Sequence, residues 1–93
     1  MNTLNVTPQD FTRVNSDVNG NPRFVVHFSQ LVNDQEREHA KQFGIQYISE
    51  LYRIAVKKAN TIGGRKYHTK SYGGGVVFQS YSLDNLCEHI NNL

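Results

Sequence analysis

Four histidines and one cysteine are the side chains of this sequence with the clearest capacity to bind a metal ion. Imidazole and thiolate are common zinc ligands, and Cys87 lies two residues before His89. No two histidines, however, are three or four residues apart, and the sequence contains no Cys-x-x-Cys pair. We therefore expect no metal site. The histidines are expected on strands (His27 and His68) or on helix surfaces (His39 and His89).

The same kinds of side chain could serve a nucleophilic or acid–base mechanism, which needs a partnered base or a pair of carboxylates. Cys87 falls on the expected inner face of the last helix, where a cysteine usually behaves as a small hydrophobic residue. The acidic cluster of Asp34, Glu36 and Glu38 lies at an expected helix start, where capping and the helix dipole account for it. We expect no enzymatic activity.

Two glycine-rich stretches, residues 63–64 and 73–75, could bring backbone amides close to a phosphate group. Neither follows the strand-to-helix order of a nucleotide-binding loop, and the Walker pattern is absent. We expect a helix end at the first stretch and a hairpin turn at the second, and no cofactor.

The remaining candidate is a block of positive charge in the second half of the chain. Residues 51–83 contain six lysines and arginines and no aspartate or glutamate, whereas residues 1–50 contain four basic and six acidic residues. Such a block is often only a solvated face, but it is also typical of surfaces that bind phosphate groups. Its candidate binding residues are Arg53, Lys57, Lys58, Arg65, Lys66, His68, Lys70 and Tyr72.

Part of this block is predicted to form a basic stripe on a strand. Side chains alternate between the two faces of a strand, so residues 65–72 would place Lys66, His68 and Lys70 on one face. Lysine and arginine side chains neutralise phosphate groups, so the stripe would suit a nucleic-acid backbone.

Tyrosines are interleaved with these cations, and exposed tyrosine rings give unpaired bases a surface on which to stack. Phe78 and at least one of Tyr67 and Tyr81 are expected in the core. Tyr72 lies beside the three glycines, at an expected hairpin tip that has no core to enter. It is therefore the expected exposed aromatic residue.

Turn residues and periodicity predict the elements that must position these side chains. Asn19-Gly20 separates two segments rich in β-branched and aromatic residues, 11–18 and 23–28, which predicts a β-hairpin. A second hairpin is predicted from residues 65–72 and 76–81. In residues 23–28 the alternate side chains Phe24, Val26 and Phe28 are expected to face the core, with Arg23, Val25 and His27 on the other side; Leu4 and Val6 are expected in an earlier extended segment.

Helices are predicted over residues 34–42, 45–60 and 83–91. Asn33 and Ser82 are expected to cap the first and the last, Gly44 to separate the first two, and residues 63–64 to end the second. The expected buried residues are Ile45, Ile48, Leu51 or Tyr52, Ala55 and Ala59 in the second helix, and Leu83, Leu86, Cys87 and Ile90 in the last; Glu50, Arg53, Lys57 and Lys58 are expected to lie mostly away from the core.

The length of 93 residues and the 38% hydrophobic content predict a single domain over residues 1–93. Short hairpins alternating with helices indicate an α+β fold, with an antiparallel sheet built from two β-hairpins and helices packed on one face. The pairing order of the hairpins and the oligomeric state cannot be read. The sequence has a single cysteine, lacks a positively charged N-terminal segment followed by an apolar run, and contains no stretch of about 18 apolar residues. These features predict a cytoplasmic protein without a membrane partner.

Two stretches of the sequence, residues 19–28 and residues 63–81, look like parts of small proteins encoded by bacteriophages and mobile elements. In size and style the whole chain resembles the phage anti-CRISPR proteins that inhibit type I surveillance complexes. The resemblance implies an inhibitor that binds a complex of Cas protein and guide RNA and blocks target DNA recognition. The segments that carry this resemblance are Asn19-Gly20-Asn21-Pro22-Arg23-Phe24-Val25-Val26-His27-Phe28, Gly63-Gly64-Arg65-Lys66-Tyr67 and Tyr72-Gly73-Gly74-Gly75-Val76-Val77-Phe78-Gln79-Ser80-Tyr81.

The sequence therefore predicts one of two functions, which belong to different classes. The first is an inhibitory module that docks on such a ribonucleoprotein through the second hairpin and the helix over residues 45–60. The second is a regulatory module that binds RNA or single-stranded DNA directly through the same face. They differ in salt dependence, because direct phosphate binding weakens steeply as the salt concentration rises.

Overall fold

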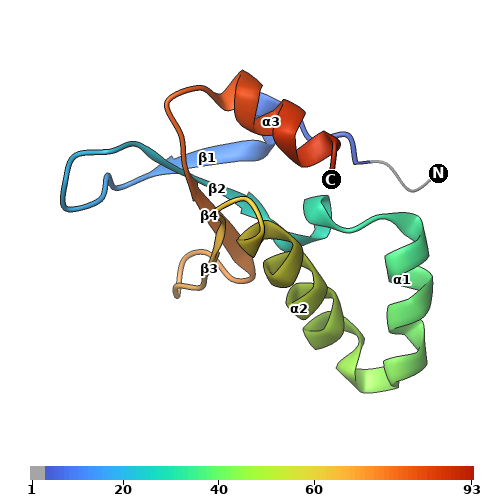
Figure 1. Ribbon diagram of the computed structural model, residues 1–93. Coiled ribbons are helices and arrows are strands. Elements are labelled where there is room, and N and C mark those ends of the chain that lie inside the picture. The colour runs from blue at the N-terminus through green and yellow to red at the C-terminus, as the bar shows by residue number, and fades with distance from the viewer. Residues whose placement is uncertain (1–3) are drawn as a thin grey trace.

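The computed structural model describes residues 4–93 as an antiparallel four-stranded sheet with helices packed against one face (Figure 1). This confirms the predicted α+β fold class. The strand order is β1-β2-β4-β3. The elements are β1 (Phe11–Val14), β2 (Arg23–His27), α1 (Asp34–Ala40), α2 (Tyr47–Asn60), β3 (Arg65–Tyr67), β4 (Gly75–Gln79) and α3 (Leu83–Asn91), with short 3-10 turns at Pro8–Asp10, Phe28–Leu31 and Lys41–Gln46.

The two hairpins form a single sheet because β2 and β4 pair along their whole length. The register places Phe24 opposite Phe78, and Val26 opposite Val76. Cross-strand partners lie on the same face of a sheet, so these pairs face the helices. The sequence could not provide this pairing order, since it depends on contacts between segments 50 residues apart.

The first hairpin is confirmed, but its first strand is shorter than predicted. β1 ends at Val14, and the loop that follows is organised around Asp17. The Asp17 carboxylate accepts hydrogen bonds from the backbone N–H groups of Asn19 (2.8 Å) and Asn21 (2.9 Å). Hydrogen bonds from Asn21 are also the main reason that the pKa of Asp17 is lowered. Local side-chain bonds of this kind replace the strand ladder.

The predicted caps and glycine breaks of the helices agree with the structure, although α1 ends two residues before its predicted end and α2 begins two residues after its predicted start. The side chain of Asn33 accepts a hydrogen bond from the backbone of Glu36, and Ser82 caps α3 in the same way. Gly44 has a φ angle of 56° and separates α1 from α2, and Gly63 has a φ angle of 87° just after α2. Both angles lie in the left-handed region, which glycine enters at little cost.

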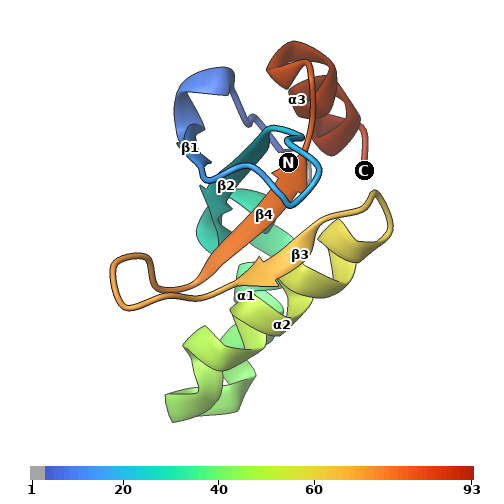
Figure 2. The same cartoon turned by 90° about the vertical axis from the view of Figure 1, so that its left-hand side faces the viewer.

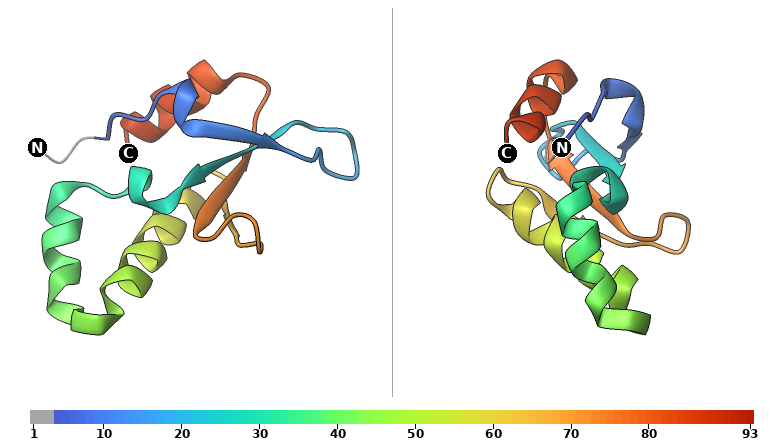
Figure 3. Two further views of the ribbon diagram at one scale, coloured as in Figure 1. Left: turned by 180° about the vertical axis from the view of Figure 1, so that it is seen from behind. Right: turned by 90° about the vertical axis from the view of Figure 1, so that its right-hand side faces the viewer.

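The predicted apolar stripe of α2 is only half buried, and this corrects the prediction. Leu51, Ala55 and Ala59 lie in the core, but Ile48 is 58% exposed and Ile45, in the turn before α2, is 99% exposed. Figure 1 shows the reason: the N-terminal end of α2 and the turn that joins it to α1 project beyond the sheet. Figure 3 shows α1 packed beside α2 along this projection.

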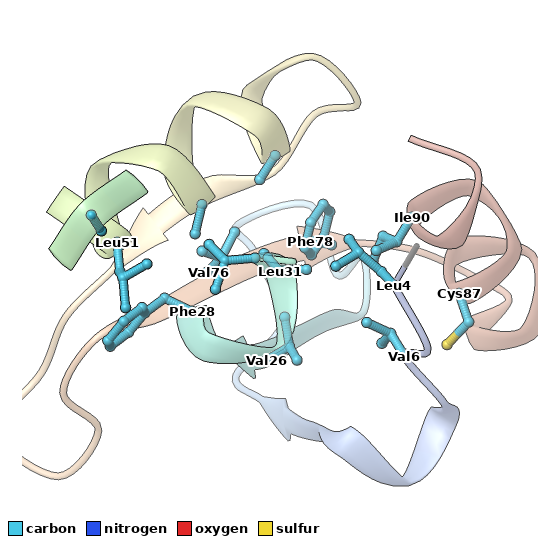
Figure 4. Close-up of a cluster of buried hydrophobic side chains, with 14 residues drawn as sticks. Leu4, Val6, Val26, Phe28, Leu31, Leu51, Val76, Phe78, Cys87 and Ile90 are labelled. Atoms are coloured by element: carbon cyan, nitrogen blue, oxygen red, sulfur yellow. The ribbon is translucent and has the colours of Figure 1, made fainter. Parts of the chain in front are cut away.

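The core lies between the sheet and the helices, and Figure 4 shows its main side chains. Phe78, Val26 and Val76 come from the strands, and Ile90 from α3. Residues 4–7 form no strand, but Leu4 and Val6 are buried as part of the core. The backbone N–H and carbonyl groups of Val6 both bond to the Asn91 side chain, at 2.8 and 2.9 Å.

Candidate binding groove

The edge strand β3 runs beside α2 (Figure 2). The side chain of Tyr52 joins the two elements. The Tyr52 hydroxyl donates to the carbonyl oxygens of Tyr67 (3.2 Å) and Gly75 (2.9 Å), the first in β3 and the second in β4. Its ring stacks on Phe28 with a centroid separation of 5.2 Å. These contacts fix the position of α2 relative to the edge of the sheet.

A groove of about 450 Å³ lies between α2 and β3, and we call it the α2–β3 groove. Tyr52 and Val56 give it an apolar floor, and Lys66 approaches from β3. The Lys66 ammonium lies 5.1 Å from the centroid of the Tyr52 ring, at cation–π distance. The groove is lined by Ser49, Tyr52, Arg53, Val56, Lys57, Asn60 and Lys66.

The cations of the groove differ in how far they are neutralised. The Arg53 guanidinium forms an ion pair with Glu50, a carboxylate that is only 7% exposed. The hydrogen bond from Arg53 lowers the pKa of Glu50 against the opposing effect of its burial. Lys57 and Lys66 are exposed, and neither forms an ion pair with any carboxylate in residues 4–93. The groove therefore carries a net positive charge from its two lysines.

Of the eight predicted binding residues, the structure brings Arg53, Lys57 and Lys66 together around the groove. Lys58 does not join them, although it is on the same helix. Its side chain is 18% exposed and forms an ion pair with Glu36 of α1 at 2.5 Å. Lys58 therefore holds α1 against α2. The prediction that Glu50 lies mostly away from the core is wrong, because Glu50 is buried.

The predicted basic stripe of Lys66, His68 and Lys70 is absent, because β3 ends at Tyr67. Lys66 lies opposite Val76 on the helix-facing side of the sheet. His68 and Lys70 lie in the loop that follows, where His68 Nδ1 accepts a hydrogen bond from the Gly74 N–H at 3.3 Å. Arg65 lies opposite Val77 on the other face. Side chains therefore alternate between the two faces of the sheet over only three of the eight residues that were predicted to form this strand.

Tyr72 is half-buried, which corrects its prediction as an exposed aromatic residue. Its loop folds back over the outer face of the sheet, where a Cβ atom added to Gly75 would lie 2.5 Å from the Tyr72 ring and 2.7 Å from Val25. Tyr72 also meets the Tyr67 ring edge-on at a centroid separation of 6.2 Å. Burial raises the pKa of Tyr72. Phe78 is buried in the core as predicted, but neither of the other two tyrosines joins it, because Tyr67 is half-buried on the outer face and Tyr81 is 78% exposed.

Sequence reasoning missed the uncharged part of the groove. Ser49, Val56 and Asn60 line it beside Tyr52 and Arg53, and these positions recur at helical intervals of three and four residues. That spacing was available in the sequence as a signal. The sequence did not indicate which side of α2 faces solvent, because that depends on the position of β3.

Residues 4–93 contain no group of three or more histidine, cysteine or acidic side chains that could hold a metal ion. Cys87 is buried in the core, and burial raises the pKa of its thiol, so it packs as the expected small hydrophobic residue. Within the same residues no helix has the length and apolar character needed to cross a bilayer.

Comparison with known proteins gives one family. The family model described as "Staphylococcus phage terminal repeat-encoded protein TreK" matches residues 2–92. The searches of curated proteins and of solved structures found no match.

Proposed function

The chain belongs to the TreK family of Staphylococcus phage terminal repeat-encoded proteins, and from this premise we propose that it is a small phage inhibitor that acts by binding rather than by catalysis. Its binding surface in this proposal is the α2–β3 groove. The target is a host assembly in the cytoplasm of the infected cell.

One observation carries this proposal: Arg53, Lys57 and Lys66 come from two elements and converge on a groove with an apolar floor. Arg53 and Lys57 are one helical turn apart on α2, and Lys66 faces them from β3. A solvated charged face needs no such convergence. A concave surface with an apolar floor and a few placed polar groups is the usual form of a binding site.

The resemblance to phage anti-CRISPR proteins names one target, the complex of Cas protein and guide RNA. Binding there would block target DNA recognition if the positively charged groove covered the guide RNA that the DNA must reach. The second candidate, direct binding of RNA or single-stranded DNA, is supported by the same three cations, because they could contact successive phosphate groups.

Capture of tagged protein from a lysate of a Staphylococcus host, with and without nuclease, tests the proposal. We expect a defined host protein or complex to be retained after nuclease treatment. Recovery of Cas subunits would support the CRISPR target, and a different host complex would replace it. Retention of nucleic acid alone, lost after nuclease, would contradict the inhibitor and favour direct nucleic-acid binding.

A further inference from the structure

We propose that the α2–β3 groove receives an acidic amphipathic helix of a partner protein, and not a strand of nucleic acid. This inference rests on the proposed function and names the chemistry of the partner. It is carried by three observations: the engagement of the aromatic rings, the exposed apolar side chains beside the groove, and the unpaired lysines along its edges.

Tyr52 is the tyrosine among the residues that line the groove, and its ring is already engaged. One face of Tyr52 stacks on Phe28, and Lys66 lies over the same ring at 5.1 Å. Tyr67 and Tyr72 contact each other on the outer face of the sheet. Single-stranded nucleic acid is bound through stacking on aromatic rings together with phosphate contacts. The groove offers cations for phosphate contacts but no aromatic ring on which a base could stack.

Exposed isoleucines extend the apolar floor of the groove toward the α1–α2 turn. Ile48, Tyr52 and Val56 are spaced at intervals of four residues, so they form one ridge along α2, and Ile45 precedes them in the turn. Ile45 and Ile48 are 99% and 58% exposed. Such a ridge adds nothing to phosphate binding, but apolar anchors are what a protein interface uses at its centre.

A neighbouring hollow of about 310 Å³ adjoins the groove along α2. It is lined by Phe43, Gln46, Ser49, Glu50 and Arg53, and it shares Ser49 and Arg53 with the groove. Phe43 is 44% exposed. The apolar surface is therefore broad enough to meet more than one side chain of a partner.

Charge and length select the partner. Arg53 is already paired with Glu50, but Lys57 and Lys66 have no carboxylate partner within residues 4–93 and therefore favour acidic groups opposite them. From Ile48 to Asn60 the helix rises about 18 Å, which equals roughly three turns of a second helix. Apolar anchors one turn apart with acidic residues beside them would match the ridge and the lysines together, as in helix-in-groove recognition.

Titration of isotope-labelled protein, followed by NMR, tests this assignment with three probes of equal length. The first is a designed peptide helix with leucines along one side and glutamates elsewhere, and the second has the same composition in an order that is not amphipathic. The third is a single-stranded oligodeoxythymidylate. We expect the first peptide to perturb residues 45–60 and 66, and to bind about tenfold more tightly than the second.

Substitution of an apolar residue separates this assignment from simple charge attraction. Ile48→Ser is expected to weaken binding of the amphipathic peptide about tenfold. Val18→Ser is the matched control, because Val18 is fully exposed at the far hairpin and should leave binding unchanged. The melting temperature of each variant is measured to check that the substitution leaves the fold intact.

Three results would overturn the inference: tighter binding of the oligonucleotide, equal binding of the two peptides, or no effect of Ile48→Ser. The lysate experiment is independent of all three, because a host complex can be captured whatever its chemistry. If the peptide titration failed but a host complex was captured, the assignment of an acidic helix would be wrong and the proposed inhibitor function would stand. Failure of capture would remove the proposed function itself.

Discussion

Gly73, Gly74 and Gly75 are equivalent in the sequence but not in the structure. A Cβ atom at Gly73 would meet only a His68 ring carbon at 3.7 Å, an ordinary contact. At Gly74 it would lie 2.8 Å from the Phe28 ring, and the φ angle there is 71°. The run of glycines therefore allows aromatic side chains to pack against the loop, and the sequence alone suggested only a mobile or closely approached turn.

Gly74→Ala is expected to destabilise the protein by about 2 kcal/mol, since it adds both a left-handed backbone strain and a clash with Phe28. Chemical denaturation measures the change in the free energy of unfolding. Gly73→Ala is the control, with an expected change within about 0.5 kcal/mol. Equal costs at the two positions would show that the loop does not pack as described.

Glu50 should contribute to stability in a pH-dependent way. Its pKa is lowered by Arg53, so the folded state favours the ionised carboxylate. This contribution is present above the ordinary pKa of 4.5 and is lost as the pH falls through the lower pKa of the folded state. Glu50→Gln should therefore reduce the melting temperature at neutral pH and flatten its decline in acid.

Melting temperatures across a pH series measure this effect. Glu88→Gln removes the same charge at an exposed position of α3 and serves as the control. If Glu50→Gln and Glu88→Gln gave the same pH profile, the ion pair with Arg53 would have no measurable role in folding.

At the scale of elements, the apolar stripe of α2 contains a buried part and an exposed part. Leu51 and Ile48 are three residues apart and both fit the helical pattern, but Leu51 is 4% exposed and Ile48 is 58% exposed. Hydrophobic periodicity gives the direction of a helix face, and it does not give the length over which the sheet covers that face. The exposed part of the stripe is the surface that we propose as the apolar contact for a partner helix.

Leu51→Ala is expected to cost about 3 kcal/mol of unfolding free energy, because it leaves a cavity in the core. Ile48→Ala should change the same quantity by less than about 0.5 kcal/mol. Denaturant titration of the two variants compares them directly. A large cost at Ile48 would mean that the N-terminal part of α2 is covered by another part of the chain.

At the scale of the whole molecule, the local features of the fold, such as helix ends, could be predicted from the sequence. The long-range pairing of strands could not. Asn33, Gly44, Gly63 and Ser82 define helix ends through their own backbone and side-chain chemistry, and all were identified from the sequence. The pairing of β2 with β4 depends on contacts between distant segments. No local pattern encodes it.

The candidate site shows the same division. The charge distribution pointed to Arg53, Lys57 and Lys66, and the structure brings these three residues together around the groove. It could not show that Lys58 turns to Glu36, or that β3 stops before His68. Those outcomes depend on the packing of α1 and on the loop that returns over the outer face of the sheet.

Two double variants with the same change in net charge test the central claim, that the α2–β3 groove is the binding surface. Lys57→Glu with Lys66→Glu alters the groove, whereas Arg65→Glu with Lys70→Glu alters the outer face and the loop. The measurement is the amount of host target that each variant retains from nuclease-treated lysate, relative to the unaltered protein. We predict that the groove variant loses the target and that the other variant keeps it. Equal retention by the two variants would contradict the claim.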